Sequence, residues 1–203
     1  MKLTLTIFLT LDGVMESSVT PTENGADGFE LGGWLVPFAD RDLGIYASEW
    51  FNQADAFLLG GETYEIMRRH WPRISDPNDV VATKLNTLPK HVVARTFRSP
   101  SWPNTDIVVG DLKTAVESLK LRPGRELQVH GSRALARALH DLGLIDEYRL
   151  WTFPVVLGTG RRLFEAGSIP TAFELIDAKT TSAGVSIHSL VPKGAPTFVT
   201  GST

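Results

Sequence analysis

Two short glycine-containing segments have the residue types of an anion-binding turn. Gly-Gly-Glu-Thr at 60–63 follows the apolar run 54–59, and Gly-Ser-Arg-Ala at 131–134 follows the run 126–130. Helical spacing resumes after each segment. A helix that begins directly after a strand leaves its first backbone N–H groups unpaired and presents its positive dipole end, where an anion can bind. Either segment could instead be only a turn, because neither is a complete P-loop or dinucleotide fingerprint.

The two segments together would suit a dinucleotide. In an open parallel sheet, ligands bind beyond the carboxyl ends of the strands, near helix starts. If 60–63 and 131–134 lie at the same edge, their backbone donors could hold the two ends of one pyrophosphate. Arg95 and Thr96, at the end of another expected strand, would add a cation and a hydroxyl for a ribose phosphate. The alternative for Arg95 is a solvated strand end.

Several other kinds of chemistry are not expected, because the residues or motifs that they require are absent from the sequence. The sequence has no cysteine, which excludes a disulfide framework, a cysteine nucleophile and zinc–thiolate sites. It contains no G-x-x-x-x-G-K-[ST], G-x-S-x-G or G-x-G-x-x-G motif. Its five histidines have no metal-ligand spacing, so no metal site is predicted. A net charge of −3 without a basic stripe argues against nucleic acid as a partner.

Strands and helices alternate along the chain in a way that can position these turns. Strands are expected at 3–11, 55–59, 89–95, 106–109, 126–130, 147–153, 173–180 and 185–191, and helices at 41–51, 61–71, 77–88, 112–121 and 133–142. Asp40 and Ser132 are expected to cap two of the helices. The pattern predicts an α/β fold with about eight strands in a mostly parallel sheet, flanking helices and a C-terminal antiparallel hairpin.

Composition and length favour one domain. The 203 residues are 42% hydrophobic and 21% charged, as in an ordinary globular protein. We expect a single domain over 1–192 and a flexible tail over 193–203. In the N-terminal apolar run from Leu3 to Leu11, every second residue is leucine or isoleucine, which favours a strand over a signal peptide. No apolar run approaches the length of about 20 residues that spans a bilayer, so a cytoplasmic protein without a membrane partner is expected.

An ordered set of motifs resembles the RibD C-terminal domain family, whose fold is that of dihydrofolate reductase. The motifs are LTLDGV at 9–14, ADAFLLGGETYE at 54–65, VHGS at 129–132, GLIDEY at 143–148 and PVVLGTGRRLF at 154–164. The resemblance extends from about residue 2 to 192. It implies an NADPH-binding reductase, often a homodimer, that transfers a hydride to a pteridine, pyrimidine or related heterocycle. A binding protein of the same fold without turnover is the competing interpretation.

The resemblance also assigns site residues by position. The residues implied for cofactor binding are Gly60, Gly61, Glu62, Thr63, Arg95, Thr96, Gly131, Ser132, Arg133 and Ala134. Those implied for the substrate pocket are Asp12, Trp34, Val155, Leu157 and Gly158.

The chain departs from the family pattern at two places. The family commonly has arginine where this chain has Gly61, and losing such a charged phosphate contact costs about 1.5 to 3 kcal/mol. NADH therefore stays open beside NADPH as the cofactor. The position of the acid that assists protonation in dihydrofolate reductases falls at Gly44, with Asp42 nearby. No catalytic residue is assigned.

Overall fold

The computed structural model describes residues 1–16, 29–94 and 100–198. The strands are β1 (Lys2–Thr10), β2 (Ala54–Gly60), β3 (Lys90–Val93), β4 (Thr105–Ile107), β5 (Glu126–His130), β6 (Glu147–Phe153), β7 (Phe173–Thr180) and β8 (Ser186–Pro192). The α-helices are α1 (Arg41–Phe51), α2 (Gly61–His70), α3 (Val80–Thr87), α4 (Leu112–Lys120) and α5 (Arg133–Asp141), and η1 (Val36–Phe38) and η2 (Trp71–Arg73) are short 3₁₀ helices.

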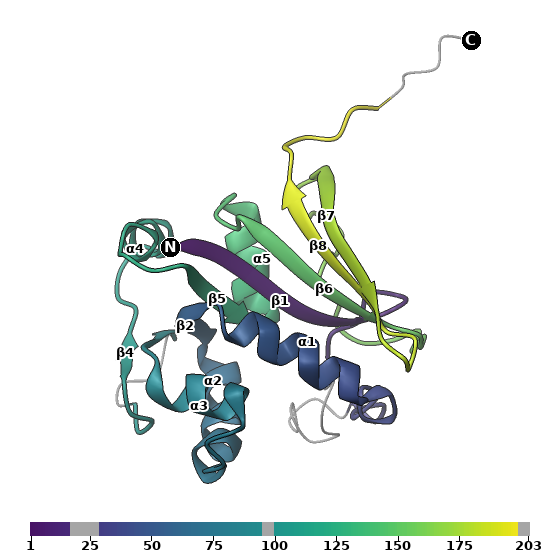
Figure 1. Cartoon of the computed structure of the whole chain (residues 1–203). Helices are drawn as coiled ribbons and strands as arrows, with labels where there is room; N and C mark the ends of the chain where they lie inside the picture. Colours follow the sequence, from purple (N-terminus) through teal and green to yellow (C-terminus); the bar gives the residue numbers. More distant parts are fainter. Residues whose placement is uncertain (17–28, 95–99, 199–203) are drawn as a thin grey trace, which may run out of the picture.

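The strands form one sheet in the order β4-β3-β2-β5-β1-β6-β8-β7 (Figure 1). Neighbouring strands are parallel except at β8, which runs antiparallel to both β6 and β7. The predicted mostly parallel, eight-stranded sheet with a C-terminal hairpin is confirmed. One detail of the first strand was wrong, because β1 ends at Thr10 and Leu11 is 62% exposed in the following turn.

Helices cover both faces of the sheet, with α1 and α5 on opposite sides (Figure 1). Helices α4 and α5 pack against Leu3 and Leu5 of β1, whereas α2 and α3 pack on the other face, against Phe57 and Leu59 of β2. The adjacent central strands β2 and β5 therefore lead into helices on opposite faces. An opening between such helices is where α/β sheets bind ligands.

The C-terminal edge continues past the expected domain boundary. Lys193 N donates to the Ala172 carbonyl oxygen, and Ala172 N donates to that of Gly194, each at 2.8 Å. Residues 193 and 194 are thus attached to the β7–β8 edge rather than part of a free tail. In the described ranges of the chain, no helix is long and apolar enough to span a bilayer.

Candidate functional site

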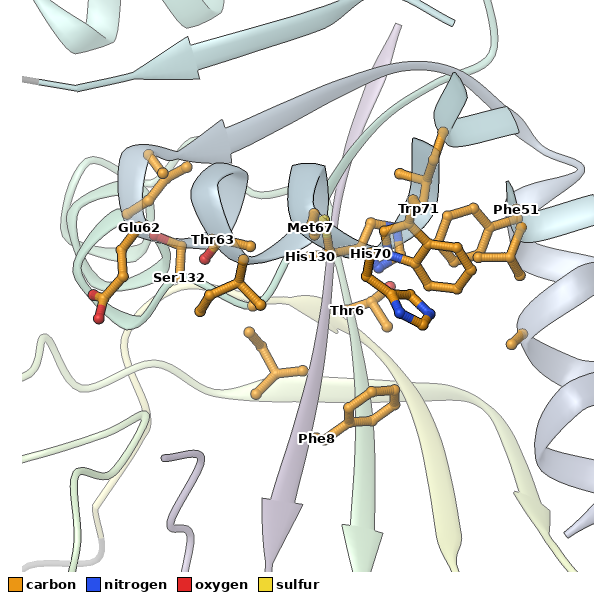
Figure 2. Close-up of a pocket in the computed structure, with 18 of the residues that line it drawn as sticks. Thr6, Phe8, Phe51, Glu62, Thr63, Met67, His70, Trp71, His130 and Ser132 are labelled. Carbon is orange, nitrogen blue, oxygen red and sulfur yellow. The ribbon is translucent and has the colours of Figure 1, made fainter. Parts of the chain in front are cut away.

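A cavity of about 2240 Å³ opens beyond the carboxyl ends of β2 and β5, with α1 and α2 along its walls (Figure 2). Pockets for drug-sized ligands usually measure about 300 to 1,000 Å³, so this cavity has room for a larger ligand or for two molecules. Its wall includes every residue of both predicted turns, 60–63 and 131–134. The structure therefore brings together the two segments that the sequence singled out.

The two turns touch each other. An ideal Cβ placed on Gly60 would lie 2.9 Å from the Ser132 Cβ and would overlap the Ser132 hydroxyl. The backbone of Gly60, at φ −73° and ψ 153°, is open to any residue, so glycine is required here by the close approach of Ser132. A Cβ on Gly131 would lie 3.5 Å from the Thr63 side chain. The turns thus form one continuous wall of the cavity.

Ser132 does not cap α5, and the prediction that it does was wrong. Its backbone is left-handed, at φ 53° and ψ 80°, and its side chain makes no capping hydrogen bond. The side chain packs against Gly60 instead. A left-handed backbone costs a non-glycine residue on the order of 1 to 3 kcal/mol, and such strain is concentrated at functional sites.

The helices that begin at the two turns differ from the other three α-helices in their capping. At α1, α3 and α4, the side chains of Asp40, Asp79 and Asp111 each accept a hydrogen bond from a backbone N–H three residues later. The predicted cap at Asp40 is thereby confirmed. Neither α2 nor α5 has a side-chain cap. No described side chain covers the positive dipole ends of these two helices, which favours an anion in the cavity beside them.

Gly61 is confined by the end of β3. A Cβ on Gly61 would lie 3.0 Å from the Ala94 Cβ, closer than ordinary van der Waals contact. A larger residue at 61, including the arginine common in the family, would therefore require β3 to shift. The cavity wall continues along Val93 and Ala94. The next two predicted cofactor residues, Arg95 and Thr96, lie outside the described residues.

The cavity has a polar end and an aromatic end (Figure 2). Glu62 and Ser132 lie at the start of α2, whereas Phe51, His70 and Trp71 lie near its other end. Arg133 also lines the cavity and forms an ion pair with Glu165 across 3.4 Å. The polar end suits phosphates, and the aromatic end suits a flat ring.

Sequence reasoning missed the residues of the aromatic end. The ring of His130 stacks on Phe51 with centroids 4.5 Å apart and planes 20° apart, and both residues line the cavity. From the sequence, His130 was only one of five histidines without metal-ligand spacing. Burial, together with the nearby positive charge of Arg149, lowers the pKa of His130 to about 3. The one available signal was its position directly before Gly131, at the end of a strand.

The cavity wall in the described part of the chain includes none of the five residues expected to form the substrate pocket. Trp34 is only 6% exposed, and its Nε1 donates to the Glu16 carbonyl oxygen at 2.8 Å. Its ring packs edge-on against Phe153, with centroids 5.4 Å apart. Trp34 thus belongs to the hydrophobic core next to β6.

Asp12, Val155, Leu157 and Gly158 tie the loop after β6 to the end of β1. The Asp12 carboxylate accepts from the backbone N–H groups of Leu157 at 3.2 Å and Gly158 at 2.9 Å, and Leu11 N donates to the Val155 carbonyl oxygen. A hydrogen bond from the Thr10 hydroxyl, supported by these N–H groups, lowers the pKa of Asp12 to about 2. Asp12 therefore acts here as an ionised anchor for the loop.

Asp42 does not reach the cavity as a proton donor would. Its carboxylate accepts from the Ser182 backbone N–H at 2.8 Å and from the Ser182 hydroxyl, at the β7–β8 turn. Gly44 does line the cavity, and it contributes no side chain. The geometry therefore gives no reason to assign a catalytic acid at position 42 or 44.

The family model of the RibD C-terminal domain matches residues 1–188, and the chain belongs to this family. It is 29% identical over 187 residues to the uncharacterized protein YyaP of Bacillus subtilis strain 168, and the alignment covers 91% of each protein.

Solved structures share the fold, which is dihydrofolate reductase-like. A proposed riboflavin biosynthesis protein from Shewanella sp. PV-4 is similar with a TM-score of 0.71 and 20% identity, covering 95% of this chain and 99% of that one. A pyrimidine reductase-like protein from Corynebacterium diphtheriae is similar with a TM-score of 0.63 and 14% identity, covering 94% and 91%.

Proposed function

We propose that this protein is an NADPH-dependent reductase of a small planar heterocycle. The observation that carries the proposal is the meeting of two uncapped helix N-termini, those of α2 and α5, in the wall of one large cavity. Membership of the RibD C-terminal domain family and the likeness to a pyrimidine reductase-like protein support the reaction class.

The residues present fit a dinucleotide. When bound, the nicotinamide cofactor supplies the hydride. Backbone N–H groups of 61–63 and 133–134 would hold the pyrophosphate, and the Thr63 hydroxyl would add a donor. Gly60 and Gly61 let the two turns and the end of β3 pack closely together, since Cβ atoms at these positions would meet Ser132 and Ala94. The aromatic end orients the rings and excludes water, so positioning is the main contribution of the protein to rate.

The choice between NADPH and NADH depends on a cation for the ribose 2′-phosphate. Position 61 carries none, so within the two turns Arg133 is the candidate at the cavity wall, with Arg95 as the further prediction. We expect NADPH to be preferred, by a smaller factor than a bidentate arginine at 61 would give.

The test is NADPH oxidation, followed by absorbance, with pyrimidine and pteridine substrates, beside a thermal-shift titration with NADPH and with NADH. A higher melting temperature with NADPH, together with NADPH oxidation in the presence of a substrate, supports a reductase. Protection without oxidation of any substrate supports the competing role of a non-catalytic binding protein. If neither nucleotide raises the melting temperature at millimolar concentration, the cofactor proposal is wrong for both roles.

A further inference from the structure

His130 occupies a cavity position where its ring is held from several sides. It is 8% exposed, lies at the end of β5 and lines the aromatic end of the cavity (Figure 2). Phe51 stacks on one face of the ring, and Phe57 approaches it with centroids 5.9 Å apart. The ring therefore has one orientation available, and its hydrogen-bonding character is decided by its fixed neighbours.

The neighbour that sets the tautomer is Gln128. His130 Nε2 lies 3.0 Å from Gln128 Oε1. The Gln128 amide nitrogen donates at 2.7 Å to the Trp50 carbonyl oxygen and at 2.7 Å to Glu126 Oε2, which fixes the orientation of the amide. Because Oε1 can only accept, His130 Nε2 must donate and therefore carries a proton.

Charged residues behind Gln128 hold this arrangement in place. Arg149 binds the Glu126 carboxylate with two hydrogen bonds, at 2.9 and 2.6 Å, and reaches Glu147 Oε1 at 2.7 Å. Lys2 pairs with Glu147 at the outer end of this buried chain. The Glu126 carboxylate is thus held in place as an acceptor for the Gln128 amide, and the chain of contacts runs from Lys2 to the cavity.

The ring carries a single proton. Burial and the charge of Arg149 keep the pKa of His130 near 3, so the imidazole is neutral at physiological pH. With the proton on Nε2, the second nitrogen, Nδ1, is a hydrogen-bond acceptor. Nδ1 has no hydrogen-bond partner among the described residues, and the His130 side chain lines the cavity. Thr6, the register partner of His130 on β1, also lines the cavity, and its buried hydroxyl has no hydrogen-bond partner among the described residues.

From this geometry we propose that His130 is a specificity-determining residue whose Nδ1 accepts a hydrogen bond from a ring N–H of a neutral, planar heterocycle bound at the aromatic end. The inference rests on the proposed function for the identity of the reaction, and on the contacts of His130 for the chemistry of recognition. A site that presents a fixed acceptor disfavours a ligand whose N–H is replaced by N-methyl, because the acceptor is then left unpaired. We expect a loss of affinity of at least about tenfold.

The experiment is ¹⁵N NMR of the histidine side chains in the full chain, with uracil and 1,3-dimethyluracil as matched probes. His130→Gln assigns the His130 signals by their disappearance. We expect a neutral ring protonated at Nε2, with an Nδ1 resonance that moves on titration with uracil and does not move with the dimethylated probe. His140 is the internal control, because its Nδ1 already faces the Tyr148 hydroxyl at 2.8 Å and its Nε2 faces the Ile169 carbonyl oxygen at 2.9 Å.

A proton on Nδ1, a charged ring at pH 7, equal shifts with both probes, or an unmoved Nδ1 resonance at the solubility limit of uracil would each overturn the proposal. The titrations are run with and without NADPH, whose binding is scored separately on the backbone amide signals of 61–63. A uracil shift at His130 without any NADPH response would retain this inference and contradict the reductase proposal. The reverse pattern would contradict only the inference.

Discussion

Gly60 and Ser132 come from the ends of two adjacent parallel strands, and the Ser132 side chain packs so closely on the Gly60 backbone that no side chain fits at position 60. A Cβ on Gly60 would lie 2.9 Å from the Ser132 Cβ, while the next nearest atom, the Leu135 Cβ, would be at an ordinary 3.8 Å. Ser132 alone therefore enforces glycine at position 60. This contact joins the two turns, and with them the N-termini of α2 and α5.

Gly60→Ala should destabilise the protein by roughly 1 to 3 kcal/mol, because the added methyl group overlaps Ser132. Adding Ser132→Gly should recover most of this loss, since it removes the overlapping atoms and glycine adopts the left-handed backbone at 132 easily. Urea unfolding of the single and double variants measures the coupling. Gly44→Ala is the control, because nothing lies within 4 Å of a Cβ at that helical position. Purely additive effects at 60 and 132 would show that the contact is not the cause.

Thr63→Ala should weaken NADPH binding about tenfold and leave the melting temperature unchanged, because one donor to a phosphate is lost from an otherwise intact turn. Calorimetric titration gives the affinity. Thr114→Ala is the matched control, since Thr114 is the third residue of α4, as Thr63 is of α2, and is exposed outside the cavity wall. An unchanged affinity in Thr63→Ala would remove this residue from the phosphate site.

Because of Lys90, the free energy of unfolding should increase with pH in the alkaline range. The residue is fully buried, and burial lowers its pKa to about 8. Its ammonium group donates to the carbonyl oxygens of Leu85 and Leu88, each at 2.8 Å. Between that pKa and the ordinary lysine value of about 10.4, the unfolded chain binds more protons than the folded one. The free energy of unfolding therefore increases with pH in this window, by up to roughly 3 kcal/mol.

Urea unfolding at about pH 7.5 and about pH 10 tests whether the free energy of unfolding increases with pH. The increase should be seen in the wild type and in Lys113→Met, a substitution of an exposed lysine on α4, and should be absent in Lys90→Met. A difference between wild type and Lys90→Met that does not change with pH would contradict a lowered pKa at Lys90.

Arg149→Met should cost roughly 3 to 5 kcal/mol of stability, because it leaves Glu126 and Glu147 buried without their shared cation. Lys193→Met, which breaks an ion pair whose side chains are 58% and 54% exposed, should cost less than about 1 kcal/mol. Chemical denaturation of both variants measures the contrast. Similar losses in the two variants would mean that the buried chain contributes no more than a surface pair.

Local signals in the sequence predicted most of the elements. Helix α1 matches the predicted range because the Asp40 cap fixes its start, and α5 is followed by Gly143 in the left-handed conformation expected after a helix. Strands β5, β6 and β7 also match, since breaker residues bound them. Both turns lie at one edge of the sheet because parallel strands end there together, whereas the adjacency of β2 and β5 comes from a strand order that the sequence did not predict.

The rest depended on contacts between distant segments. Glu126 and Gln128 alternate with apolar residues, a pattern typical of a strand with one face in solvent. In the structure α1 covers this face, so both side chains are buried and belong to the hydrogen-bonded chain that ends at His130. Nothing local to Ser132 indicates that Gly60 approaches it and leaves α5 uncapped. Trp34 and Asp12 lie in or beside loops, whose paths no periodicity determines, and both were expected at a pocket that the cavity does not extend to.

The central claim is that the two joined turns bind the pyrophosphate of a nicotinamide dinucleotide, and a crystal structure of the protein with NADPH tests it most directly. We predict pyrophosphate oxygens at about 3 Å from the backbone N–H groups of 61–63 and of 133–134, with the nicotinamide ring directed towards the aromatic end. A pyrophosphate bound away from both turns, in crystals that do contain NADPH, would contradict the account.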